Sequence, residues 1–92
     1  MDQIIKATQY TIATLRQSAD AILEVDAATT YFGFCKKGTL AETDHTWSIM
    51  QVTQTDPGQA GNKILFKWAG GQCNYAFQFS AAAGYTYYFK KF

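Results

Sequence analysis

The stretch KILFKWAGGQCNYAFQFS, residues 63–80, decides the fold class of this chain. Apolar residues alternate on both sides of a central glycine pair: Ile64, Phe66 and Trp68 before it, and Cys73, Tyr75, Phe77 and Phe79 after it. Successive side chains of a β-strand point to opposite faces, so each half predicts a strand with one apolar, aromatic-rich face. Lys67, Asn74 and Gln78 fall on the other, wetter face. The stretch therefore predicts a β-hairpin that turns at Gly70-Gly71.

Four further segments have the composition of strands. They are AILEVD at 21–26, TYFGFC at 30–35, TWSIMQVTQT at 46–55 and YTYYF at 85–89. Gly33 inside the second of these predicts a bulge or a close approach by another backbone. In the third, Trp47 and Ile49 share one face while Met50 and Val52 share the other, so this strand is either covered on both faces or bulged. Asp56-Pro57-Gly58 predicts a turn after it.

The first twenty residues are the least decided part of the chain. Their threonines lower helix propensity and they contain neither glycine nor proline, which favours an extended arm or edge strand, with a short helix as the alternative. The domain organisation that follows is an N-terminal arm or edge segment at 1–20 and one β-domain at 21–92. The expected fold is all-β, a small antiparallel β-sandwich or barrel of six to seven short strands with an N-terminal arm.

Composition favours contact with other proteins. The chain has 92 residues, of which 16% are aromatic and only 16% are charged, and its net charge is +1. So few charges leave part of the aromatic surface for another protein, and they supply no basic patch for nucleic acid or a membrane surface. We therefore expect a homo-oligomer, with no nucleic-acid, membrane or small-molecule partner. The residues predicted to lie at an interface are Tyr10, Ile12, Tyr85, Tyr87, Tyr88 and Phe92.

The cysteine and histidine content predicts no metal site. Cys35 and Cys73 are interpreted as free buried thiols, because no signal peptide or further cysteine pair accompanies them. His45 is the single histidine, and no paired cysteine or histidine spacing typical of zinc is present. No apolar run is as long as a transmembrane helix. We expect a soluble protein without a cofactor.

No arrangement of residues in the sequence supports catalysis. Asp44, His45 and Ser48 lie close in sequence, but adjacent residues of a strand point to opposite faces, so Asp44 is badly placed to orient His45. Glu24 and Asp26 fall on one strand face, as a glycosidase pair would, yet two acids beside a turn are usually solvated. We therefore predict a protein that is not an enzyme, with a small hydrolase using His45 as a remote alternative.

An aromatic platform for sugars is the main alternative to a structural role. Tyr85, Tyr87, Tyr88 or Trp47 could stack on a carbohydrate, which would make the chain a carbohydrate-binding β-module. That hypothesis requires coplanar rings that are exposed to solvent. Burial of the same rings inside the sheet would argue against it.

The order of short motifs from residue 31 onward resembles a group of small structural proteins of tailed-bacteriophage virions. The motifs are Tyr31-Phe32-Gly33-Phe34, Lys37-Gly38-Thr39, Trp47-Ser48-Ile49, the stretch KILFKWAGG at 63–71, Tyr75-Ala76-Phe77 and Tyr85-Thr86-Tyr87. The family pattern is an aromatic-x-Gly strand, a Pro-Gly-Thr turn, a Trp-x-Ile strand, a Trp-Ala-x-Gly turn and an aromatic C-terminal strand. The resemblance covers about two thirds of the chain. The chain departs from it at Lys37, where the family tends to have proline, and at residues 81–84, where it often has a charged segment with a tryptophan.

This resemblance implies a non-enzymatic, β-rich building block of the virion. It would be assembled in several copies at the head, neck or tail of the particle, in the host cytoplasm, and its partners would be further copies of itself and other virion proteins. The motif Trp68-Ala69-Gly70-Gly71 would have a structural role in such a protein. Trp68 anchors the end of a strand in the core, and the glycines let the backbone turn.

Overall fold

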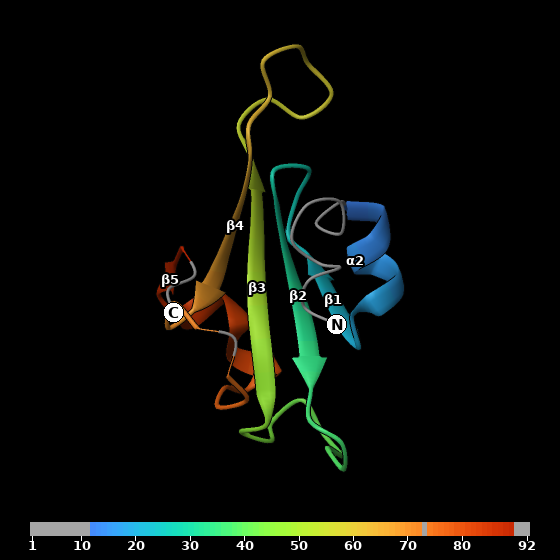
Figure 1. Ribbon diagram of the computed structural model, residues 1–92, viewed down its shortest axis with the longest axis vertical. Coiled ribbons are helices and arrows are strands. Elements are labelled where there is room, and N and C mark those ends of the chain that lie inside the picture. Colours follow the sequence, from blue (N-terminus) through green and yellow to red (C-terminus); the bar gives the residue numbers. More distant parts are fainter. Residues whose placement is uncertain (1–11, 73, 90–92) are drawn as a thin grey trace.

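The computed structural model describes residues 12–72 and 74–89 (Figure 1). Its elements, in chain order, are helix α2 (Ile12–Ser18), strands β1 (Ala21–Glu24), β2 (Thr29–Cys35), β3 (Trp47–Gln54) and β4 (Ile64–Ala69), the 3-10 helix η1 (Phe79–Gly84) and strand β5 (Tyr87–Tyr88). The five strands form one antiparallel sheet in the order β1-β2-β3-β4-β5. The predicted β-rich, antiparallel character is confirmed. The predicted count of six to seven strands and the sandwich or barrel are not found in the described part, which holds one open sheet.

The central strand β3 is buried on both of its faces. Ile49 and Met50 are both 0% exposed, and Val52 is 2% exposed. The pairing of β3 with β2 runs from Thr29↔Thr53 to Cys35↔Trp47 with no inserted residue, so β3 is not bulged against β2. Of the two alternatives that the sequence left open for this strand, coverage on both faces is the one observed.

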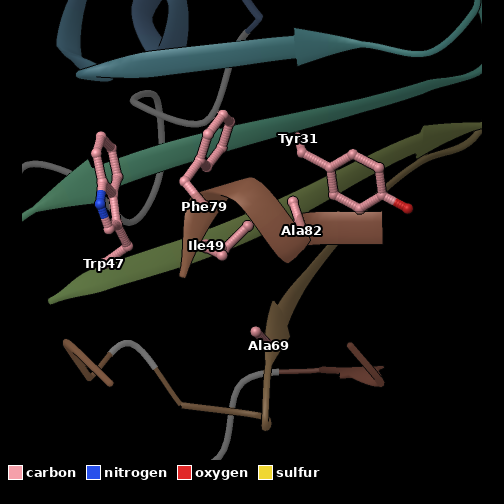
Figure 2. Close-up of a cluster of buried hydrophobic side chains, with 6 residues drawn as sticks. All are labelled: Tyr31, Trp47, Ile49, Ala69, Phe79 and Ala82. Carbon is pink, nitrogen blue, oxygen red and sulfur yellow. The ribbon is translucent and has the colours of Figure 1, made fainter. Parts of the chain in front are cut away.

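Two apolar clusters lie on opposite faces of the sheet. One contains Tyr31, Trp47, Ile49, Ala69, Phe79 and Ala82, and η1 covers it (Figure 2). The other contains Leu15, Phe32, Met50, Val52 and Trp68, and α2 contributes Leu15 to it. We call these the η1 cluster and the α2 cluster. Their members alternate along β2 and β3, as the alternation of side chains along a strand requires.

Gly33 of β2 is required for a close approach by two aromatic side chains. A Cβ atom at this position would lie 2.5 Å from Cδ1 of Phe79 and 2.9 Å from Cε3 of Trp47. The rings of Phe79 and Trp47 are in contact, with centroids 5.3 Å apart. The sequence predicted a bulge or the approach of a backbone at this glycine. The observed reason is instead the approach of side chains that fill the η1 cluster.

The prediction of a second hairpin strand after Gly70-Gly71 is wrong. β4 forms as predicted, but it pairs with β3 and β5, and residues 74–78 make only an isolated bridge, Phe77 to Trp47. The chain then forms η1, in which Phe79 and Ala82 are buried. β5 pairs with β4 at Trp68 and Ala69, where the hairpin partner would begin, and the alanines that follow favour a helical turn over a strand. Phe79, the last aromatic of this alternation, is thus buried under the sheet, whereas Tyr75 is 51% exposed.

Gly70 and Gly71 end β4 as the sequence predicted. Both have positive φ, 70° and 76°, and the N–H of Gly71 donates to the carbonyl oxygen of Trp68 at 2.9 Å. A Cβ atom at Gly70 would lie 2.9 Å from Cζ of Phe77. The turn therefore needs glycine for its backbone conformation and for the space that Phe77 occupies.

The N-terminal segment is helical where it is described. Residues 12–18 form α2, so the extended arm is wrong for this part and the short helix is the observed alternative. Leu15 is 4% exposed and packs in the α2 cluster, which joins the helix to the rest of the domain. No helix in residues 12–72 and 74–89 combines the length and the hydropathy needed to cross a membrane.

The loop between β3 and β4 extends the sheet at one end of the molecule (Figure 1). The side chain of Asn62 crosses this loop, accepting from the N–H of Asp56 at 2.9 Å and donating to Oε1 of Gln54 at 3.0 Å. Gly58 has the positive φ, 78°, that a turn after Pro57 requires. The predicted turn at 56–58 is confirmed.

Candidate interaction surface

Two of the predicted interface tyrosines are part of the core packing. The hydroxyl of Tyr87 donates to the carbonyl oxygen of Ala82 at 2.6 Å, and the hydroxyl of Tyr85 accepts from the backbone N–H of Gln78 at 2.9 Å. Both bonds attach η1 to the C-terminal segment. Burial raises the pKa of Tyr87 far above its ordinary value, and the neighbouring Tyr31 and Tyr85 add to the shift. These two side chains therefore contribute to the packing of the domain.

Tyr88 is the predicted interface residue that the structure places at the surface. It is 53% exposed and lies in β5 opposite Trp68. The next residue, Phe89, is 54% exposed, and Nζ of Lys67 lies 5.1 Å from the centre of its ring. A cation over an exposed aromatic face contributes about 0.5–1 kcal/mol and restrains the ring in a position where a partner can contact it.

The other three predicted interface residues stay predictions. Tyr10 and Phe92 lie outside the described residues. Ile12 is the first residue of α2.

The four rings proposed as a sugar platform are not exposed together on one face. Trp47 is 6% exposed and packs on Phe79 inside the η1 cluster. Tyr87 packs on Tyr31 with ring planes 44° apart, and Tyr88, the next residue of β5, points to the opposite face of the sheet. This geometry does not offer a flat stacking surface made of these residues.

The loop at 36–46, between β2 and β3, presents a leucine to solvent. Leu40 is 94% exposed. Oδ2 of Asp44 accepts from the backbone N–H groups of Leu40 and Ala41 at 3.0 and 3.2 Å, and Nε1 of Trp47 donates to the carbonyl oxygen of Ala41 at 3.1 Å. Nε2 of Gln78 also donates to the carbonyl oxygen of Thr43 at 2.7 Å. The loop holds Leu40 outward with its backbone already ordered.

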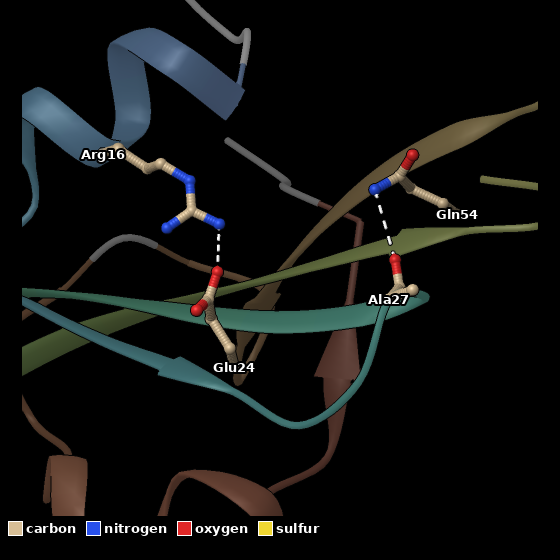
Figure 3. Close-up of polar contacts among 4 residues, drawn as sticks. All are labelled: Arg16, Glu24, Ala27 and Gln54. Carbon is tan, nitrogen blue, oxygen red and sulfur yellow. Dashed lines mark hydrogen bonds and ion pairs between the residues drawn. The ribbon is translucent and has the colours of Figure 1, made fainter. Parts of the chain in front are cut away.

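The outer edge of β1 carries a second set of exposed apolar side chains. Leu23 is 40% exposed and Val25, just after the strand, is 55% exposed. Glu24 forms an ion pair with Arg16 of α2 (Figure 3). Nε2 of Gln54 donates to the carbonyl oxygen of Ala27 at 3.5 Å and connects the β1–β2 turn to the end of β3 (Figure 3).

The sequence analysis did not select these apolar side chains as interface residues. Leu40 lies in a segment without periodicity, where an isolated leucine in an otherwise polar loop was the available signal. Leu23 and Val25 were assigned to a strand, and only the sheet order, with β1 at an edge, shows that they border solvent. Tyr75 and Ile64, 51% and 42% exposed, were assigned to the apolar face of the central hairpin.

The residues considered for catalysis lie in different environments. His45 is exposed, whereas Ser48 is 3% exposed and its hydroxyl has no hydrogen-bond partner among the residues that the structure describes. Oδ2 of Asp44 is occupied by backbone N–H groups of its own loop. Oδ1 of Asp26 accepts from the N–H groups of Ala28 and Thr29 and so stabilises the β1–β2 turn. Of the acids considered for catalysis, Asp44 and Asp26 thus order loops, and Glu24 is paired with Arg16.

Cys35 is a free thiol at the end of β2. Burial raises the pKa of Cys35, and the carboxylate of Asp20 raises it further through a hydrogen bond and its charge. Oδ2 of Asp20 also accepts from the backbone N–H of Cys35 at 2.9 Å. Cys73, the other cysteine, lies outside the described residues. Among the described residues, no group of three or more His, Cys, Asp or Glu side chains could hold a metal ion.

Comparison of the chain with protein family models, with curated proteins and with solved structures finds no match.

Proposed function

We propose that this chain is a structural protein of a tailed-bacteriophage virion, a head, neck or tail component that works by self-association and by docking onto other virion subunits. Its place in a virion rests on the motif order described above. Its mode of action is supported by one observation, the exposed large apolar side chains distributed over a well-packed sheet. In the described residues these are Leu23, Val25, Leu40, Ile64, Tyr75, Tyr88 and Phe89, each at least 40% exposed.

The physical argument concerns what an ordered apolar surface provides. Single exposed apolar side chains are ordinary on soluble proteins. Here, however, Leu40 is 94% exposed on a loop that side-chain hydrogen bonds hold, and Phe89 lies under a lysine. Ordering a loop before binding removes part of the entropy cost of association. Such side chains are therefore suited to act as anchors for another protein.

The finer form of the expected fold needs more than one open sheet: a sandwich needs a second sheet, and a barrel needs further strands to close the first. The described part supplies one sheet with β1 and β5 at its edges. We propose that a neighbouring subunit contributes the strands that extend or cover this sheet in the assembled particle. The association of subunits would then complete a fold that one copy leaves open.

The proposal is tested by two measurements on one protein. Native mass spectrometry and light scattering of the purified protein should show oligomers, and peptides of the chain should be found in purified virus particles. A protein that stays monomeric and is absent from particles contradicts the proposal. Binding on a glycan array that is lost on Tyr88→Ala would instead support the carbohydrate-binding alternative.

A further inference from the structure

We propose that two copies of this chain associate by antiparallel pairing of their β1 strands, with Leu23 opposite Leu23 of the second copy at a two-fold axis. The pairing joins the sheets of the two copies into one continuous sheet. This inference deepens the proposed function, because it names the contact through which self-association begins.

The hydrogen bonds of β1 show which of its backbone groups point outward. The N–H of Val25 donates to the carbonyl oxygen of Thr29 at 3.1 Å, on the same register as the β1–β2 ladder. Hydrogen-bonded pairs alternate along an antiparallel ladder, so Leu23 is bonded to β2, whereas the N–H and C=O groups of Ile22 and Glu24 point away from it. β1 is an edge of the sheet, and no residue of the described part donates to or accepts from these groups.

Apart from its short length of four residues, this edge lacks the sequence features that usually prevent pairing with another strand. Natural edge strands carry lysine, proline or a bulge in mid-strand, or are covered. β1, with the sequence AILE, has no lysine or proline, and its one charge, Glu24, is paired with Arg16 of the same chain. The bordering side chains Leu23 and Val25 are 40% and 55% exposed, so the edge is accessible.

Charge selects one register for the pair. The outward groups of Ile22 and Glu24 allow three close registers, in which Ile22 is opposite Ile22, Glu24 or Asp26 of the second copy. The first places Glu24 opposite Asp20 of the second copy, and the third places Glu24 opposite Glu24. Like charges directly opposite each other are destabilising, so both are disfavoured.

In the remaining register no acid of β1 faces an acid of the second copy. The acids that do face each other, Asp20 and Asp26, lie outside the strand, and each accepts hydrogen bonds from backbone N–H groups of its own chain. Ile22 lies opposite Glu24 of the second copy, and each such hydrogen-bonded pair exchanges two bonds, giving about four in total. On the other face of the sheet Leu23 lies opposite Leu23, and Ala21 opposite Val25. The exposed apolar row of each copy is thereby covered by the same row of the other.

The first test uses proline at an outward N–H. Glu24→Pro removes a backbone donor that β2 does not use, so the monomer should keep its fold and melting temperature. Sedimentation velocity should show that association is weakened about tenfold or more. Glu24→Gln is the matched control, since it loses the charge and keeps the N–H, and it should associate as the unmodified protein does. Leu23→Lys is a second variant that leaves the backbone unchanged, places two ammonium groups together at the axis and should also yield monomers.

The second test reports the register. In a background in which Cys35 and Cys73 are replaced by serine, Leu23→Cys should form disulfide-linked dimers on mild oxidation, because the two thiols meet in a non-hydrogen-bonded pair. Val25→Cys is the control, because its side chain is more exposed but lies opposite Ala21 of the second copy. It should cross-link at least about tenfold more slowly, since its thiols are separated in this register.

Three results would overturn the inference: a protein that is monomeric at every concentration, dimers that persist in Glu24→Pro, or faster cross-linking through Val25→Cys. These failures are distinguishable from failure of the proposed function. A chain found in virus particles whose association is insensitive to Glu24→Pro keeps its structural role and loses only this contact. A β1-paired dimer absent from particles keeps the contact and loses the role.

Discussion

The substitution Gly33→Ala tests how the core of this protein is packed. The added methyl group would lie 2.5 and 2.7 Å from two ring carbons of Phe79 and 2.9 Å from a ring carbon of Trp47. Separations this short require one of the rings to move. Both side chains are 6% exposed and pack on each other, so neither can turn out to solvent. The methyl group must therefore displace η1 or distort β2.

Two opposing effects set the size of the change. Overpacking of a filled core costs about 1–3 kcal/mol, and three contacts below 3.0 Å place this site toward the upper end. Replacing glycine by alanine in a strand recovers roughly 0.5–1 kcal/mol through the entropy of the unfolded chain. We expect a net loss of about 2 kcal/mol in the free energy of unfolding. For a domain of this size that lowers the melting temperature by roughly 8–16 °C.

Chemical denaturation and thermal melting, followed by circular dichroism, measure this loss. Gly84→Ala is the matched control, because no atom lies within 4 Å of the Cβ it would add and its φ is not positive. It should be neutral or slightly stabilising. In the background of Phe79→Val, which removes the ring, the cost of Gly33→Ala should fall by more than about 1 kcal/mol. An unchanged cost in that background, or a Gly33→Ala protein as stable as the original, would refute the packing argument.

Three further predictions follow from buried polar groups. Ser48→Ala should be neutral or raise the free energy of unfolding by about 1 kcal/mol, because the buried hydroxyl has no partner in the described part; a loss above that amount in urea denaturation contradicts this. Asp20→Asn should lower the pKa of Cys35, so that the thiol is alkylated faster at pH 8 when the other cysteine is serine; an unchanged rate means that burial alone sets the pKa. Tyr87 has a raised pKa in the folded state, so its contribution to stability is present below pH 10 or so and is lost as pH rises beyond that value. Tyr87→Phe should flatten the alkaline loss seen in melting curves, whereas the exposed control Tyr88→Phe should not.

The sequence predicted the central strands well because local and tertiary preferences agree there. β2, β3 and β4 lie within about two residues of their predicted limits. In β3, apolar residues fall on both faces, and the structure places a cluster on each. Alternation, β-branched residues and turn residues all favour the same answer in these segments.

The prediction from the sequence was wrong where aromatic residues alternate without forming a strand. Phe77 and Phe79 alternate like strand residues, but Phe77 is at an isolated bridge and Phe79 begins a 3-10 helix. Alternation alone does not distinguish a strand from an irregular segment that buries every second ring. The deciding fact is nonlocal, since β5 occupies the edge of β4 where the predicted hairpin partner would pair.

The same nonlocal information decides which tyrosines are available to a partner. Tyr85, Tyr87 and Tyr88 were all predicted at an interface, with Tyr85 and Tyr87 on one face of the strand and Tyr88 on the other. The hydroxyls of Tyr85 and Tyr87 bond to residues at the two ends of the segment containing η1, and Tyr88 alone of the three is more than half exposed. The position of η1 under the sheet explains why Tyr85 and Tyr87 are used in packing, while Tyr88 on the other face stays exposed.

The distribution of buried and open backbone indicates where association has to occur. At the centre of the sheet both faces are covered, because the η1 cluster and the α2 cluster bury β3 from opposite sides. A partner therefore gains little by approaching the middle of either face. In the described part β1 and β5 are the edge strands of the sheet, and β1 is the longer, with four residues against two. A strand edge bordered by Leu23 and Val25 offers hydrogen bonds and apolar burial together, which is the combination that strand addition uses.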